Sequence, residues 1–319
     1  MYIYKTFLSP QIEGFIAYRE ATGFWNSSSE YHLIRFERYC VENYPKATAL
    51  TQEMVDSWYN KHSHLSNNTR RTGIIVISKF IEYLRVRGKT TVVRPPLPKR
   101  DKRKYIPHAF TQDELKRFFR NCDTLPDTPI SLRTQVRRIT VPVFFRLMYS
   151  SGLRVVETRM LRAEDVDLAE GVLNIRHSKG PDQHYVALHE TMLALMKKYD
   201  LDMQELQPNR RYFFQSASGK PFSEEWVRYN FIDMWKECSD AHAVPYDLRH
   251  NYAVENINQW IGEGYDFSRF VYLSKSMGHR EFESTKYYFH LVPAFADILE
   301  ELSGQSFDDM IPEADYAEI

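Results

Sequence analysis

Apolar side chains between residues 8 and 90 recur every three or four positions, and no stretch there alternates as a strand does. This spacing predicts helices that begin near Ser9, Ser28 and Thr51, each a residue able to cap a helix, and a further helix from Thr69 to Val86. A small helical bundle would bury their apolar faces. Its expected core includes Ile74, Ile75, Phe80 and Leu84.

The helical pattern stops between Gly88 and His108, where four prolines and a dense run of Lys and Arg follow one another. Proline lacks the amide proton that regular structure needs, so this stretch predicts an extended connector. We therefore expect a helical domain at 1–90, a basic linker at 91–109, a second domain at 110–303 and an acidic tail at 304–319.

The second domain is expected to be mainly helical with a small antiparallel sheet. A capping box, Thr111 to Glu114, opens its first helix, and a long apolar helix leads up to Ser151. Short apolar segments bounded by turn residues then predict strands. The expected strands are Val166–Leu168, Val172–Arg176, Tyr185–Leu188 and Tyr212–Phe214, followed by a helix at Ser223–Cys238.

Composition bounds the class of protein. Of 319 residues, 43% are apolar, and no apolar run approaches the roughly 18 residues needed to cross a membrane. The first residues lack the layout of a signal peptide, and three scattered cysteines give neither a disulfide framework nor a metal-ligand spacing. We expect a globular cytoplasmic protein with no metal and no membrane partner.

The charge is balanced overall, with 42 basic and 42 acidic residues, but it is unevenly distributed. Residues 1–108 hold 18 Lys and Arg against 9 Asp and Glu, whereas residues 297–319 hold 8 Asp and Glu and neither Lys nor Arg. A basic surface attracts a nucleic-acid backbone, and the acidic tail could shield such a surface before DNA binds. The candidate phosphate contacts are Arg70, Arg71, Lys79, Arg85, Arg87, Lys89, Lys99, Arg100, Lys102, Arg103 and Lys104. For each of them, a solvated surface role is the alternative.

Candidate chemistry is concentrated in the last third of the chain, which sets out Arg249, His279 and Tyr288 in that order. Arginine offers a planar fork of donors that fits two phosphate oxygens, and histidine exchanges a proton near neutral pH. A tyrosine hydroxyl becomes a nucleophile where a cationic site stabilises its anion. Further upstream, Gly152 permits a sharp turn that would place Arg154 at a helix start, where anions bind well. The set indicates phosphoryl transfer through a phosphotyrosine.

Three motifs resemble those of the tyrosine recombinases, the phage integrase family. Residues 152–157 read GLRVVE and resemble the family motif G-L-R-x-x-E, and residues 246–250 read YDLRH and resemble H-x-L-R-H. Residues 277–279 read MGH, with Thr285 and then Tyr288 to His290 downstream, and resemble L-G-H…T-x-x-Y-x-H. The three motifs occur in the family's order across about half of the chain.

The resemblance implies a two-domain, C-shaped DNA clamp that cuts and rejoins duplex DNA. Two arginines, Arg154 and Arg249, would neutralise the scissile phosphate while Tyr288 attacks it. In the family a lysine of the strand hairpin acts as general acid, and Lys179 matches it; His279 would donate to the phosphate. No cofactor is implied, because one phosphodiester is exchanged for another.

The family also assembles as a tetramer on two DNA sites and exchanges a C-terminal helix between subunits. We therefore expect a homotetramer on double-stranded DNA, with accessory DNA-bending or directionality proteins as candidate partners. The task itself, whether integration, excision, transposition, inversion or dimer resolution, is not specified by the motifs.

One departure from the family pattern and one rival residue leave alternatives open. Tyr246 stands where the second motif begins with histidine, and a phenol is a poor proton shuttle at neutral pH. Tyr287 is a rival nucleophile next to Tyr288, although the spacing from His279 favours Tyr288. The alternative functions are a relaxing type IB topoisomerase, a catalytically silent DNA-binding protein and, more remotely, a hydrolase that uses Tyr288 differently.

Overall fold

The computed structural model describes residues 2–25, 27–101, 105–125, 131–176, 183–263, 267–279 and 288. The chain forms two compact units, Met1–Tyr105 and Ile106–Ile319, each with its own core. Of the helices in the described ranges, none joins enough length to enough apolar character to cross a bilayer.

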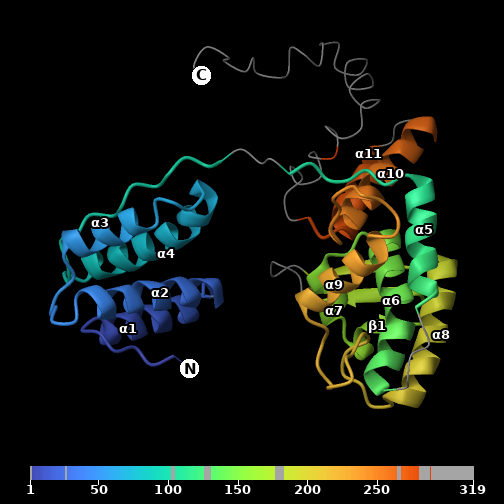
Figure 1. Ribbon diagram of the computed structural model, residues 1–319, viewed down its shortest axis with the longest axis horizontal. Coiled ribbons are helices and arrows are strands. Elements are labelled where there is room, and N and C mark those ends of the chain that lie inside the picture. Colours follow the sequence, from blue (N-terminus) through green and yellow to red (C-terminus); the bar gives the residue numbers. More distant parts are fainter. Residues whose placement is uncertain are drawn as a thin grey trace, which may run out of the picture. The chain divides into compact units, whose positions relative to one another are not determined.

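The first unit is built from α1 (Ser9–Ala21), α2 (Ser27–Asn43), α3 (Gln52–Lys61) and α4 (Asn67–Val86) (Figure 1). Helix α4 packs against α1 and α2, and α3 packs against α2. Apolar residues from all four helices meet in one core, including Phe15, Phe36, Trp58 and Phe80. Thr51 caps α3 by accepting a hydrogen bond from the Met54 amide, as its position predicts.

Residues 92–101 have no regular secondary structure and are attached to α3 and α4 of the same unit. The Gln52 side chain pairs with the backbone of Val93, Arg71 donates to the carbonyl oxygen of Pro98, and Asn68 pairs with Asp101. Val92 is buried in the helical core. We call residues 92–101 the strap.

The second unit centres on α6 (Leu132–Ser151), which packs against α5 (Gln112–Asp123), α8 (Glu190–Leu206) and α10 (Asp247–Glu263). The shorter helices are α7 (Val155–Met160), the 3-10 turn η1 (Ala163–Asp165), α9 (Glu224–Trp235) and α11 (Phe267–Ser276). The predicted capping box forms at α5, where Thr111 and Glu114 each accept the other's backbone amide. Both reciprocal bonds fix where the helix begins.

A three-stranded antiparallel sheet of order β1-β2-β3 lies in the second unit. Its strands are β1 (Val166–Asp167), β2 (Val172–Ile175) and β3 (His184–Ala187), with Val172 opposite Ala187 and Ile175 opposite His184. Leu173, Ile175 and Val186 turn into the core. The prediction of a mainly helical protein with a small antiparallel sheet is confirmed.

Four local predictions are wrong. The cap of α1 is Leu8, because Pro10 occupies the first turn while the Ser9 hydroxyl bonds to the carbonyl of Thr6. Ser28 lies inside α2, one residue past its start.

Ile75 is 37% exposed, since adjacent helical residues point about 100° apart and Ile74 already faces the core. In place of a strand at Tyr212–Phe214 there is a single bridge from Tyr212 to Arg162, and core packing holds the two phenylalanines.

Candidate active site

A tight turn places Arg154 at the start of α7. Helix α6 ends at Ser151, and Gly152 then adopts a left-handed conformation with φ of 62°. A Cβ at this position would lie 2.3 Å from Cδ1 of Tyr252, so that only glycine fits. Arg154 is the N-cap residue of α7, as the sequence predicts.

Glu157 holds Arg154 in two ways. Its Oε2 accepts the backbone amide of Arg154 at 2.8 Å, and its Oε1 accepts Nη1 of the same arginine at 2.5 Å. The sequence leaves open whether Glu157 caps the helix or orients the arginine. The carboxylate does both.

Arg249 lies in the first turn of α10 and is fully buried. Its Nη1 donates to the carbonyl oxygen of Gly152 at 2.5 Å, and its Nη2 donates to that of Met277 at 2.8 Å. The same Nη2 lies 2.9 Å from Nε2 of His279. Burial lowers the pKa of Arg249, yet a guanidinium stays charged at neutral pH.

The two guanidinium groups meet at Glu157, whose side chain is inaccessible to solvent. Arg249 Nη1 lies 3.8 Å from Oε2 of this carboxylate, opposite the bond that Arg154 makes to Oε1. One negative charge therefore faces two positive charges, which leaves a local positive excess that suits an anion.

Arg154 and Arg249 both donate hydrogen bonds to the turn at Met277–His279. The Gly278 carbonyl oxygen accepts Nη2 of Arg154 at 3.0 Å, next to the Met277 carbonyl that Arg249 holds. Gly278 has φ of 60°, and a Cβ there would lie 2.6 Å from Cε1 of His184 on β3. His184 thus packs directly on the turn, a role that no sequence pattern signals.

His279 and Tyr288 stack on each other. Their rings are nearly parallel, at 16°, with centroids 6.2 Å apart, and His250 lies 5.5 Å from the Tyr288 ring. Burial, with the charges of Arg249 and Arg154, lowers the pKa of His279 to about 3. Tyr288 is 2% exposed and belongs to a small apolar cluster with Ile257, Phe270 and Met277.

Tyr246 borders a depression of about 580 Å³ next to Arg154. Its ring packs edge-on against His250, with centroids 4.9 Å apart, and its side chain reaches solvent. Exposed Arg228 on α9 lines the same depression and adds a cation that the motifs did not indicate. In the part of the chain that the structure describes, His, Cys, Asp and Glu side chains form no group suited to a metal ion.

The structure therefore brings Arg154, Arg249, His279 and Tyr288 together from separate segments of the second unit. Lys179 and Tyr287 lie outside the described residues, as do Lys102, Arg103 and Lys104.

The other basic residues predicted to contact phosphate belong to the first unit and are divided among several sites. Lys79, Arg85 and Arg87 line one pocket; Arg70 lies over the Tyr59 ring, and Arg71 holds the strap. Lys89, Lys99 and Arg100 are exposed.

Comparison with known proteins finds relatives over most of the chain. The profile of the phage integrase family matches residues 108–294. The tyrosine recombinase XerC of Bacillus pumilus is 30% identical over 202 residues, which are 61% of this chain and 60% of that protein. A putative integrase/recombinase, y4rE of Sinorhizobium fredii, is 28% identical over 90% of this chain and 93% of its own length.

Among solved structures, the site-specific recombinase XerH bound to its palindromic difH substrate, in a post-cleavage complex, has a similar fold. The TM-score is 0.60 at 17% identity, and the match covers 90% of this chain and 81% of the XerH chain.

Proposed function

Because the chain belongs to the phage integrase family of tyrosine recombinases, we propose that it cuts and rejoins duplex DNA through a 3′-phosphotyrosyl intermediate. The observation that carries this proposal is the pair of guanidinium groups, Arg154 and Arg249, held on one buried carboxylate. Arg249 is fully buried, so it has to be uncovered before it reaches DNA. The two arginines can then neutralise the two non-bridging oxygens of a phosphodiester.

In the proposed cleavage step, the Tyr288 hydroxyl oxygen forms a bond to phosphorus, and the bond from phosphorus to the 5′ oxygen breaks. Lys179 gives its proton to the departing 5′ oxygen, and the tyrosine proton passes to solvent or to a nearby base. Rejoining reverses these transfers with a 5′ hydroxyl from another strand. One phosphodiester replaces another, so the exchange needs no external energy source.

His279 and Tyr246 are proposed as hydrogen-bond donors to the same phosphate. His279 is neutral at physiological pH because its pKa lies near 3, so it can donate from one ring nitrogen while the other accepts from Arg249. Tyr246 borders the depression beside Arg154, and its phenol can donate without changing its charge.

The burial of Tyr288 implies that the DNA-free chain keeps its nucleophile covered. With 2% of the residue exposed, its hydroxyl must be uncovered before it reaches phosphorus. We propose that DNA binding and assembly of several copies uncover it, with residues 1–90 and 110–303 gripping the duplex and a C-terminal helix passing between copies. Such coupling would limit cutting to assembled sites.

A suicide substrate tests the proposal. Duplex DNA carrying a candidate crossover site is nicked close to the cleavage position. Cleavage then releases a short oligonucleotide that carries the 5′ hydroxyl, and because it diffuses away the strand cannot be rejoined and the covalent adduct accumulates. We expect a protein–DNA adduct with the unaltered chain and none with Tyr288→Phe. An adduct that persists in Tyr288→Phe would assign the nucleophile to another residue, Tyr287 first, and relaxation of supercoiled DNA lacking any site would indicate a topoisomerase instead.

A further inference from the structure

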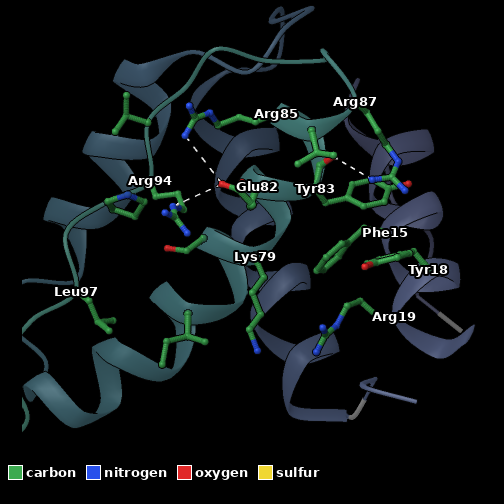
Figure 2. A pocket seen from close by; sticks show the side chains of 15 residues that line it. Phe15, Tyr18, Arg19, Lys79, Glu82, Tyr83, Arg85, Arg87, Arg94 and Leu97 are labelled. Carbon is green, nitrogen blue, oxygen red and sulfur yellow. Dashed lines mark hydrogen bonds and ion pairs between the residues drawn. The ribbon is translucent and has the colours of Figure 1, made fainter. Parts of the chain in front are cut away.

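The first unit contains a pocket that the proposed chemistry does not use. It lies between α1, α4 and the strap and has a volume of about 750 Å³ (Figure 2). Phe15, Tyr18 and Tyr83 form an aromatic wall, with Phe15 and Tyr83 ring centroids 5.4 Å apart. We call this site the α1/α4 pocket.

The rim of the α1/α4 pocket is strongly basic. Its cations are Arg19, Lys79, Arg85, Arg87 and Arg94. The one carboxylate among the lining residues, Glu82, lies 4.0 Å from Arg85 and 3.7 Å from Arg94, so it offsets part of this charge. Figure 2 shows Lys79 and Arg19 extending to the same side of the pocket from facing helices.

Aromatic packing orients one of these cations. The guanidinium of Arg87 lies 3.8 Å from the Tyr83 ring centroid and 5.3 Å from that of Tyr18. Arg87 Nη1 also donates to the carbonyl oxygen of Tyr83 at 3.4 Å. Stacking and this bond restrict the side chain, so Arg87 loses little further freedom when its remaining donors bind an anion.

Apolar side chains are exposed on the same surface. Val86 is 74% exposed, Val93 61% and Leu97 46%, and Ile75 and Tyr18 add to them. Carrying several large apolar residues within one basic pocket costs free energy in water, which a partner with both apolar and acidic side chains would recover.

Residues 304–319 have this composition. The segment reads GQSFDDMIPEADYAEI, with five Asp and Glu and neither Lys nor Arg, and with Phe307, Met310, Ile311 and Tyr316 among the acids. We propose that the α1/α4 pocket binds this acidic segment from a second copy of the chain. The inference rests on the assembly proposed above, since the segment comes from another copy.

A DNA backbone is the competing occupant, and it fits the pocket less well. Phosphates would pair with the cations, but a backbone of phosphate and sugar offers little apolar surface to cover Val86, Val93 and Leu97. An acidic peptide satisfies both kinds of lining residue. Occupied by it, the pocket would withhold Lys79, Arg85 and Arg87 from DNA, so that assembly state and DNA binding become linked.

The test measures binding of a fluorescent peptide of residues 304–319 by anisotropy. The protein is the full chain in which Asp308, Asp309, Glu313, Asp315 and Glu318 are changed to their amides, so that its own segment competes weakly. We expect saturable binding that weakens with salt, and weakening of about tenfold or more in Lys79→Glu and in Arg87→Glu. Exposed Lys46→Glu, outside the pocket, is the matched control and is expected to bind as the parent does.

Equal peptide affinity in Lys79→Glu, Arg87→Glu and Lys46→Glu, or no saturable binding at all, overturns the inference. So does weaker DNA binding by the two pocket variants together with unchanged peptide binding, which would make the pocket a DNA contact. Circular dichroism checks that each variant folds. Adduct formation on the suicide substrate is measured separately, so failure of peptide binding leaves the proposed recombinase chemistry standing.

Discussion

Arg249 donates a hydrogen bond from Nη2 to Nε2 of His279 over 2.9 Å. Arginine has no acceptor, so the imidazole accepts at Nε2 and carries its proton on Nδ1. The bond joins the first turn of α10 to the turn that follows α11, and it fixes the histidine in its neutral form.

The first prediction concerns pH. His279 has a pKa of about 3 in the folded protein, lowered chiefly by burial, against an ordinary value of 6.5. As the pH falls below 6.5, His279 becomes protonated in the unfolded chain but stays neutral in the folded chain. The contribution of His279 to stability is therefore lost progressively toward pH 3. His279→Asn should therefore lose less stability than the unaltered protein between about pH 7 and pH 5. Urea unfolding at both values checks this, and identical losses would contradict it.

The second prediction concerns the shared carboxylate. Glu157→Gln leaves two guanidinium groups beside a neutral amide in a buried site, and it should cost about 3 kcal/mol of unfolding free energy. Glu164→Gln is the matched control, because Glu164 pairs with Arg162 at the solvent-exposed surface and its loss should change the stability far less. Denaturant titration distinguishes the two. Similar losses in both variants would mean that Glu157 is not the charge holding the arginines.

The third prediction concerns the shape of the guanidinium. Arg249→Lys keeps the charge, but a single ammonium cannot reach the Gly152 and Met277 carbonyls and His279 with the same geometry. We expect a loss of about 2 kcal/mol in stability from the unpaired carbonyl groups. Adduct formation on the suicide substrate should fall by about 100-fold or more.

Exposed Arg228→Lys serves as the stability control for this variant, with an expected change of less than about 0.5 kcal/mol. Adduct formation by Arg249→Lys at the unaltered rate would show that the planar fork is dispensable.

The fourth prediction concerns the turn under His184. Gly278→Ala places a methyl group 2.6 Å from the His184 ring and also strains a backbone with φ of 60°. It should abolish adduct formation and lower the melting temperature. Gly219→Ala has comparable strain, with φ of 76°, but meets nothing within 4 Å, so it should lose only about 1 kcal/mol.

Adding His184→Ala to Gly278→Ala should restore part of the lost stability, since the added methyl group would then have room. A double-mutant cycle measures this coupling. Strictly additive losses would show that the two residues do not press on each other.

Much of the fold is readable from the sequence because its signals are local. Thr51 and Thr111 mark the starts of α3 and α5, because each side chain accepts a hydrogen bond from the backbone amide three residues later. The predicted cap of α1 is wrong by one residue, because Ser9 is itself the first residue of the helix, followed by Pro10, and Leu8 is the cap. The strand predicted at Tyr212–Phe214 is absent for a tertiary reason. Phe213 and Phe214 are buried in the core, and such burial does not require them to join a sheet.

For the site, the order of the motifs along the chain predicts which residues come together, and the structure adds the hydrogen bonds and ion pairs that position them. Glu157 follows Arg154 by one helical turn, so its first contact is local, whereas its approach to Arg249 depends on the packing of α10 against α6. His184 could not be found in this way. A histidine at the start of a strand has no pattern that reveals the glycine opposite it.

The strap determines where the first unit can be truncated for expression as a separate fragment. A fragment stopped at residue 90 would discard Val92 from the interior and the partners of Gln52, Arg71 and Asn68, and should be poorly soluble. Extending the same fragment to Tyr105 retains them all.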